Sequence, residues 1–177
     1  YIEDARANIV AAVERCNRLI SKVKKAAKIR DLPIVDVNLS EVLMDRVSAA
    51  QRVYGVKVIV DDFEEPIMVR ANSLLGELIW NLLENAARHN PRSDRRIWVS
   101  GHREDEFFAL IIEDNGPGIS DARKATLFDR GRGYGGVGLT LVAHMVRECG
   151  GRIKVADRVE GHPDRGSKFV LYLPLAE

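Results

Sequence analysis

The sequence predicts an α+β fold, a two-layer α/β sandwich in which a mixed, largely antiparallel sheet carries three helices on one face. Roughly seven short segments rich in β-branched and aromatic residues alternate with segments whose apolar residues recur at helical spacing. A chain of 177 residues with 46% apolar content can bury one core of this kind. An additional bundle helix is expected at the N-terminus, outside the sandwich.

The N-terminal segment predicts a bundle helix. Its apolar residues follow alternating steps of three and four, at Ile2, Ile9, Val13, Cys16, Ile20, Val23 and Ala27. A seam this broad is expected to pack against another helix or a second copy of itself. We therefore divide the chain into a partial helical domain at residues 1–30 and a second domain at residues 31–177. The basic residues near the end of the helix are interpreted as a solvated face.

The predicted strands are short and mostly separated by charged turns, which favours antiparallel pairing between neighbours. They lie at residues 34–37, 56–60, 67–70, 95–101, 107–113, 152–156 and 168–173. The glycine-rich stretch at residues 115–138 is predicted to be a mobile loop without an element of its own.

The three helices of the sandwich are predicted at residues 40–55, 72–90 and 137–149. Ser40 is the expected N-cap of the first, and Asn72 or Ser73 that of the second. Gly150 and Gly151 are expected to end the third. The residues expected to face the core are Val42, Leu43, Val47, Ala50, Leu78, Leu82, Leu83, Ala86, Ala87, Leu139, Leu141, Val142, Met145 and Val146.

The composition narrows the function classes. A formal net charge of +1 gives no argument for a nucleic-acid partner. Cys16 and Cys149 occupy apolar positions and are interpreted as reduced core thiols of a cytosolic protein. No apolar run reaches the roughly 20 residues of a membrane span, and no signal peptide opens the chain. Because Tyr1 lies inside a helical pattern, we expect a piece of a longer protein, whose membrane anchoring stays open.

Polar residues mark one stripe of the second predicted helix. Glu77, Asn81, Asn85 and His89 recur every four residues, with Arg88 beside the last. Amides within an otherwise apolar helix are costly to bury unless something binds them. By itself the pattern leaves two interpretations open: a binding stripe, or a core helix whose asparagines cap loops or bond the backbone.

A turn with the sequence Asp-Asn-Gly-Pro-Gly-Ile, residues 114–119, follows directly on an apolar strand. The sheet fixes a carboxylate at the strand end, and glycines allow the backbone to approach a ligand closely. Asp114 can therefore accept a hydrogen bond from an exocyclic amine such as that of adenine. The alternative is an ordinary turn.

Two weaker signals follow. The glycine run at residues 131–138 leads into a helix, whose first N–H groups offer a phosphate cradle. Gly166 and Ser167 open the last strand. Each pattern alone is more typical of a flexible loop or a strand start.

Taken in order, together with the Leu127–Phe128 pair, these motifs resemble the ATP-binding catalytic domain of sensor histidine kinases. That domain belongs to a superfamily shared with gyrase, Hsp90 and mismatch-repair ATPases of the MutL type. The resemblance covers residues 34–175, and residues 1–30 are similar to the second helix of the dimerisation and phosphotransfer hairpin. It implies a cytoplasmic ATP-dependent protein-histidine kinase that passes the γ-phosphate to a histidine upstream of Tyr1, and then to a response-regulator aspartate.

The resemblance also implies roles for individual residues. Asn85 would hold Mg²⁺, Asn81 would face the phosphates and Arg88 would contact them. Glu77 could polarise the nucleophile, although a structural or solvent role is equally open, and Asp114 would read adenine. The remaining implied nucleotide contacts are Gly116, Gly118, Ile119, Phe128, Gly135, Gly136, Val137, Gly138, Leu139 and Ser167. The implied cofactors are ATP and Mg²⁺, and the implied partners are a response-regulator receiver domain and a second copy bound through the N-terminal helix.

Asn81 discriminates within the superfamily. Hydrolysing members are expected to carry a glutamate there, whereas an amide has no basic lone pair with which to activate water. This disfavours an ATPase of the gyrase or Hsp90 type. Two departures from the family leave a degenerate, kinase-like scaffold as the alternative: the lid between Phe128 and Gly135 is short and lacks the family's usual second aromatic residue, and no histidine of the chain sits in a phosphoacceptor motif.

Overall fold

The computed structural model describes residues 6, 10, 13, 31–63, 66–128 and 136–177. Its main layer is a five-stranded sheet in the order β2-β4-β5-β7-β6. The β2–β4 pair is parallel, and the other three pairs are antiparallel. The strand bounds are β2 (Lys57–Val60), β4 (Arg96–Glu104), β5 (Phe107–Asp114), β6 (Arg152–Val159) and β7 (His162–Pro174). The predicted mixed, largely antiparallel sheet is therefore confirmed.

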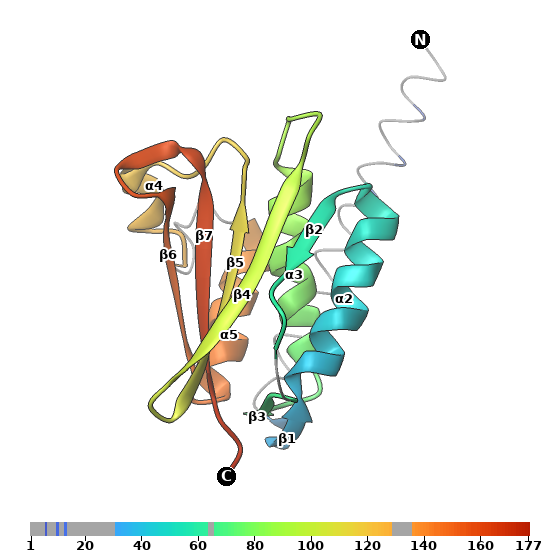
Figure 1. Cartoon of the computed structure of the whole chain (residues 1–177), viewed down its shortest axis with the longest axis vertical. Coiled ribbons are helices and arrows are strands. Elements are labelled where there is room, and N and C mark those ends of the chain that lie inside the picture. The colour runs from blue at the N-terminus through green and yellow to red at the C-terminus, as the bar shows by residue number, and fades with distance from the viewer. Residues whose placement is uncertain (1–5, 7–9, 11–12, 14–30, 64–65, 129–135) are drawn as a thin grey trace.

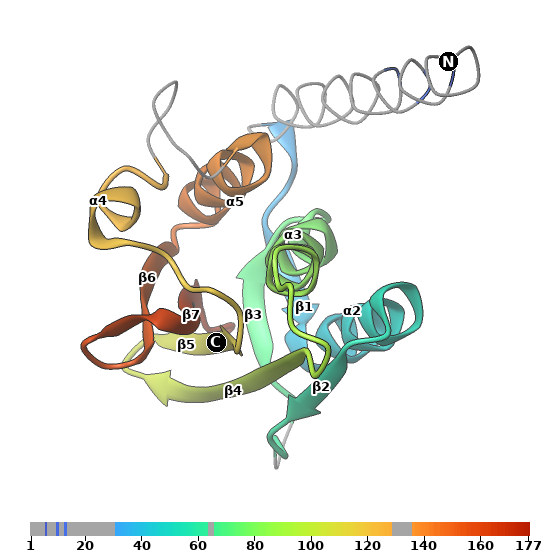
Figure 2. The ribbon, with the colours of Figure 1, turned by 90° about the horizontal axis from the view of Figure 1, so that it is seen from above.

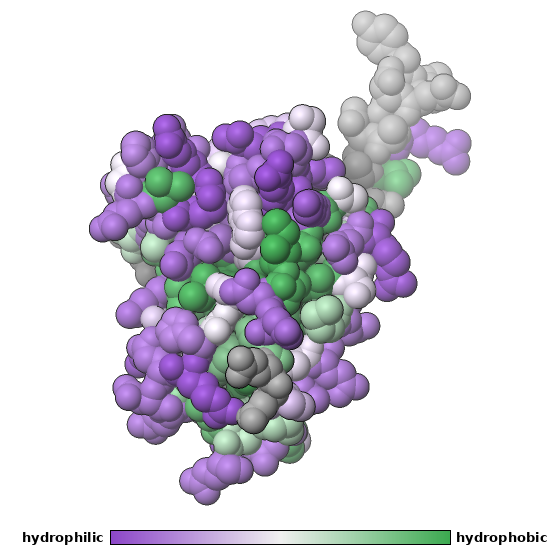
Figure 3. Space-filling model, viewed as in Figure 1, coloured by the Kyte–Doolittle hydropathy of each residue, from purple (hydrophilic) through white to green (hydrophobic). Residues whose placement is uncertain are grey.

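The second layer consists of α2 (Leu39–Tyr54), α3 (Leu75–Arg88) and α5 (Gly136–Glu148). All three helices lie on the same side of the sheet, as Figures 1 and 2 show from two directions. This confirms the predicted two-layer arrangement. None of the helices among the described residues 31–63, 66–128 and 136–177 lies on the opposite sheet face, and Figure 3 shows apolar side chains gathered at its centre among hydrophilic ones.

Two predicted strands lie outside the main sheet. β1 (Val35–Asn38) and β3 (Met68–Ala71) form their own antiparallel pair. Within β3, Val69 and Ala71 are buried while the alternate residues are exposed, as expected for a strand with one solvated face.

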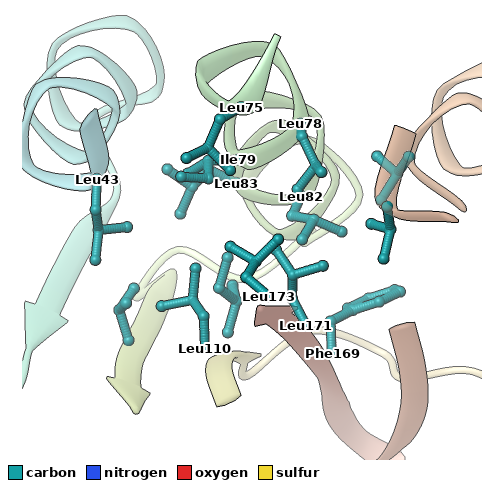
Figure 4. Close-up of a cluster of buried hydrophobic side chains, with 14 of the residues drawn as sticks. Leu43, Leu75, Leu78, Ile79, Leu82, Leu83, Leu110, Phe169, Leu171 and Leu173 are labelled. Atoms are coloured by element: carbon teal, nitrogen blue, oxygen red, sulfur yellow. The ribbon is translucent and has the colours of Figure 1, made fainter. Parts of the chain in front are cut away.

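Side chains from α3 fill the space between the two layers. Figure 4 shows Leu78 and Leu82 pointing toward Leu171 and Phe169 of β7, with Leu43 of α2 at the side. All residues predicted to face the core are buried except Val42, which is partly buried and packs against the core. The apolar periodicity of the helices therefore gave the correct inward faces.

Several predicted helix ends need correction. Asn38, not Ser40, caps α2, because its side chain accepts a hydrogen bond from the backbone N–H of Glu41 at 3.2 Å. Ser40 instead accepts from the backbone N–H of Ile67 at 3.0 Å, tying α2 to the segment before β3. The N-cap position of α3 is Leu74, whose side chain makes no capping bond, and Asn72 accepts from the Leu74 N–H at 3.0 Å.

The predicted end of α5 is confirmed. The backbone N–H of Gly151 reaches the carbonyl of Val146, and that of Gly150 reaches Arg147, both at 2.9 Å. Gly150 has a φ of +75°, so the pair forms a Schellman end that requires a left-handed residue.

The stretch predicted as a loop contains a short helix, α4 (Asp121–Lys124). The prediction was wrong here because a single turn is too short to show apolar periodicity. Lys124 anchors this turn through ion pairs with Asp121 and with Asp157 of β6. The rest of the predicted loop includes residues 129–135, which lie outside the described residues.

Little of the N-terminal segment is described. Arg6, Val10 and Val13 are helical and exposed. The predicted bundle seam, Cys16 and the domain boundary after residue 30 lie outside the described residues or remain untested, and they stay predictions.

Candidate functional site

A cavity of 270 Å³ opens where the end of β5 meets α3, α4, α5 and the first half of β7. It is lined by Asn85, Ala86, His89, Asp114, Pro117, Gly118, Ile119, Arg123, Leu127, Leu139 and Ser167. The fold thus brings together the second half of the asparagine stripe, the Asp-Asn-Gly turn, the helix after the glycine run and the start of the last strand. These are the motifs that the sequence singled out.

Asp114 forms the floor of the cavity at the end of β5 and is only 6% exposed. β5 and β7 are paired up to Glu113 and Lys168, which brings Ser167 beside Asp114. The Ser167 hydroxyl donates to one carboxylate oxygen of Asp114, and the Gly116 N–H donates to the other at 2.7 Å. Burial raises the pKa of Asp114, while these hydrogen bonds act in the opposite direction. A carboxylate fixed in this way retains lone pairs that can accept a hydrogen bond from a ligand amine.

Glycines let the turn after Asp114 pack directly on β7. Gly118 has a φ of +69°, and a Cβ there would lie 1.9 Å from the carbonyl oxygen of Pro163. A Cβ at Gly166, whose φ is +101°, would lie 1.8 Å from the carbonyl oxygen of Asp114. Side chains at either position would push the turn away from the strand, so the floor of the cavity depends on both glycines.

Asn115 holds the same turn against the end of α3. Its buried side chain accepts from the Asn90 amide at 2.7 Å and from the Arg96 N–H at 2.9 Å. It also donates to the Asp94 carbonyl at 3.0 Å. No role for Asn115 was predicted from the sequence, because its partners lie on segments that only the fold brings together.

The asparagine stripe divides along α3. Asn85 and His89 line the cavity, whereas Asn81 and Glu77 are not among its lining residues. Asn81 is 7% exposed and donates from its side-chain amide to the Glu77 carbonyl at 2.7 Å. For Asn81, the structure therefore agrees with the second interpretation of the stripe, in which an asparagine of the helix bonds the backbone.

Arg88 turns away from the cavity. Its side chain is 55% exposed and lies 3.8 Å from the Glu84 carboxylate, one turn back along α3. Glu84 also accepts a hydrogen bond from the Tyr54 hydroxyl at 3.0 Å, which holds it toward α2. The structure therefore does not bring Arg88 together with the other site residues, and its phosphate contact stays a prediction.

The remaining predicted contacts lie around the rim or outside the described residues. Gly116 is buried under the turn, Phe128 packs against the core, and Gly138 lies in the first turn of α5. Only the helical backbone of Gly136 and Val137 is described, and Gly135 lies outside the described residues.

Five lining residues were not among the predicted nucleotide contacts: Ala86, His89, Pro117, Arg123 and Leu127. His89 could have been predicted as a lining residue, because it follows Asn85 by four residues and therefore lies on the same face of the helix. Arg123 had no signal, because the short helix that carries it was not predicted.

Two absences hold for the described part of the chain. It contains no helix long and apolar enough to cross a membrane. It also contains no cluster of three or more histidine, cysteine, aspartate or glutamate side chains arranged to hold a metal ion.

Comparison with known proteins agrees with this geometry. Residues 71–177 match the family described as histidine kinase-, DNA gyrase B-, and HSP90-like ATPase. The chain is 33% identical over 153 residues to the sensor protein CitS of Halalkalibacterium halodurans, covering 80% of this chain and 28% of that protein. It is 31% identical over 188 residues to the sensor protein ChvG of Rhizobium meliloti, covering 92% of this chain and 32% of that protein.

Among solved structures, the mycobacterial sensor histidine kinase MprB is similar with a TM-score of 0.68 and 27% identity. That match covers 80% of this chain and 98% of the solved one. This chain spans less than a third of its curated relatives CitS and ChvG. It belongs to the histidine kinase-, DNA gyrase B- and HSP90-like ATPase family, as an ATP-binding catalytic domain of the histidine kinase type.

Proposed function

We propose that this chain supplies the ATP-binding catalytic part of a two-component sensor histidine kinase. It would donate the γ-phosphate of ATP to a histidine outside the 177 residues, for onward transfer to a response-regulator aspartate. The observation that carries the proposal is that buried Asp114 and Ser167 line the same cavity as Asn85 of α3.

The Asp114 end of the cavity suits adenine. The carboxylate can accept from the exocyclic amine, and its own position is fixed by Ser167 and the Gly116 N–H. Ile119 and Leu139 offer apolar contact for the flat faces of the base. Phe128, which packs against the core nearby, closes this side of the site in the proposal.

Asn85 suits a magnesium ion that is shared with phosphates. Mg²⁺ is usually held by one or two protein oxygens together with substrate oxygens and water, rather than by a cage of side chains. Asn85 lines the cavity and can supply one amide oxygen to such a donor set. When bound, the ion would neutralise charge on the phosphates.

Asn81 favours transfer to histidine over hydrolysis. Its amide cannot accept a proton from water, and its N–H is engaged with the Glu77 carbonyl. In the proposal, the domain holds and orients ATP until a histidine nucleophile arrives, so that positioning supplies most of the rate. Arg88 would need another rotamer to reach the phosphates, and Glu77 keeps a supporting role on the helix.

The proposal extends to partners. A receiver domain would accept the phosphate from the histidine, and a second copy would pair through the helix at residues 1–30. ATP as the donor also leads us to propose a cytoplasmic placement. The degenerate scaffold remains the competing function, because it would bind nucleotide without transferring phosphate.

Calorimetric titration with ATP, in the presence and absence of Mg²⁺, tests the site. Asn85→Ala is expected to remove the Mg²⁺-dependent gain in affinity, about tenfold or more for loss of one contact to a charged group. Asn38→Ala, at the cap of α2 and away from the cavity, is the matched control. An Asn85→Ala variant that keeps the full Mg²⁺ dependence would refute the metal assignment.

Phosphate transfer needs a separate measurement. The chain is incubated with γ-labelled ATP and a histidine-bearing acceptor hairpin from a sensor kinase such as CitS or ChvG. Labelled hairpin with negligible labelling of the chain itself supports the kinase. Nucleotide binding without transfer supports the scaffold, and rapid phosphate release to water supports an ATPase.

A further inference from the structure

Arg123 brings a second full charge to the cavity. Among the described lining residues, Asp114 supplies the carboxylate and Arg123 supplies the guanidinium. The two residues come from different elements, the end of β5 and the turn α4. The cavity is therefore electrically polar, with a negative floor and a positive charge on α4.

The position of Arg123 depends on how α4 is anchored. The N–H groups of Arg123 and Lys124 both bond to the Ser120 carbonyl at 2.9 Å. Lys124 binds Asp157 of β6, and the side chains of both are only 14% exposed. Neighbouring helical residues point about 100° apart. Fixing Lys124 toward β6 therefore directs Arg123 to another side, where it lines the cavity.

We propose that Arg123 is a binding residue for the nucleotide phosphates and that its charge, set against Asp114, determines which way the nucleotide lies. This inference rests on the proposed ATP-binding function. A polyphosphate is repelled by the Asp114 carboxylate, whereas the base amine is attracted to it. The phosphates consequently lie toward Arg123, near Asn85 and the start of α5.

Arginine suits this role better than lysine. Its planar guanidinium can donate two parallel hydrogen bonds to phosphate oxygens, while an ammonium acts as a point charge. The anchor provided by Lys124 also limits the ordering cost of binding, because α4 is already held against β6.

The test compares adenosine, ADP and ATP binding to the complete chain by calorimetry. Arg123→Ala is expected to weaken ADP and ATP by about tenfold and to leave adenosine within about twofold. Arg123→Lys should recover part of the loss. The matched control is Arg103→Ala, an exposed arginine that pairs in register with Phe108 at the far end of β4 from the cavity.

A second variant tests the anchor. Lys124→Met should weaken ADP by less than Arg123→Ala does, and adding Arg123→Ala to it should cost less than Arg123→Ala costs in the unmodified chain. Fully additive losses would contradict the anchoring argument.

The outcomes separate this inference from the proposed function. If the unmodified chain binds none of the three ligands, the ATP-binding function itself fails. If it binds them and Arg123→Ala leaves the ratio of ADP to adenosine affinity unchanged, only the role of Arg123 fails. Equal weakening of adenosine and ADP would also overturn it, because Arg123 would then shape the base pocket.

Discussion

The two ends of the cavity are built differently. The Asp114 end belongs to the sheet: its carboxylate is 6% exposed and is held by Ser167 of the neighbouring strand and by the Gly116 N–H. The other end, where the proposal places the phosphates, draws on side chains of helices, among them exposed His89 on α3 and exposed Arg123 on α4. In the proposed binding mode, the base end is prearranged by backbone pairing, while the phosphate end relies on longer side chains.

This difference suits two functions in the proposed binding mode, selection of the base and contact with the phosphates. A prearranged acceptor in a buried corner favours selection of one base, because little reorganisation is needed. Exposed cationic and polar side chains can follow a flexible polyphosphate as it is delivered to a nucleophile. Variants that disturb one end and leave the other intact can therefore test the comparison directly.

The largest effect is expected from Gly118→Ala. The new Cβ would lie 1.9 Å from the Pro163 carbonyl oxygen at a φ of +69°, so the turn must move off β7. We expect a loss of about 3 kcal/mol in unfolding free energy, measured by urea denaturation, together with loss of adenosine binding.

Gly161→Ala is the matched control for this prediction. Its φ is +72°, but a Cβ there meets nothing within 4 Å. Only the left-handed backbone strain remains, worth about 1 kcal/mol. Equal losses in the two variants would show that packing of the turn on β7 contributes nothing to the base end.

A smaller effect is expected from Asn115→Ala, which removes the three hydrogen bonds of the buried amide to Asn90, Arg96 and Asp94. The expected cost is about 2 kcal/mol of unfolding free energy, again from urea denaturation. Because Asn115 joins the Asp114 turn to the end of α3, adenosine and ADP should weaken together. Unchanged stability would mean that the two ends are held independently.

The smallest effect concerns pH. Burial raises the pKa of Asp114, so its carboxylate takes up a proton at a higher pH than an ordinary aspartate. Only the ionised form is the full acceptor for the base amine. Adenosine affinity is therefore expected to be constant above the folded pKa and to fall as the pH drops through it, above the ordinary range of aspartate. Adenosine affinity should be measured as a function of pH in a His89→Gln variant, so that the His89 imidazole cannot contribute to the pH dependence.

Asp114→Asn provides the control: its adenosine affinity should be weak and independent of pH over the same range. The stability of the fold is expected to depend on pH in the opposite direction to adenosine affinity. Because native Asp114 binds its proton more tightly than the unfolded chain does, lowering the pH from the folded value toward the ordinary value stabilises the native state through this group. The asparagine variant should lack that gain.

Much of this molecule could be predicted from the sequence. Apolar spacing gave the inward faces of α2, α3 and α5, and alternation gave the strands. Asn85, Asp114 and Ser167 were predicted as nucleotide contacts and do line one cavity. The inward faces and the strands were predictable because each depends on a repeat that is complete within a few consecutive residues. The three contacts were implied by the family resemblance, which rests on the order of several motifs along the chain.

The predictions that were wrong or unsupported concern residues whose partners are distant in the chain. Asn38 and Ser40 lie two residues apart and are both good caps, and only the approach of Ile67 decides which one caps α2. Arg88 follows the stripe of Asn85 in sequence, yet Glu84 and Tyr54 draw it toward α2. Such choices depend on partners that are distant in the chain.

The sequence by itself determined the α+β class, the buried faces, the family and the residue types of the site. It could do so because periodicity and glycine turns are local properties, and because the order of the motifs along the chain resembles that of a known family. Only the tertiary structure decided that Arg123 lines the cavity and that Asn115 fastens the turn. Those roles depend on distances between β5, β7, α3 and α4, and packing alone sets these distances.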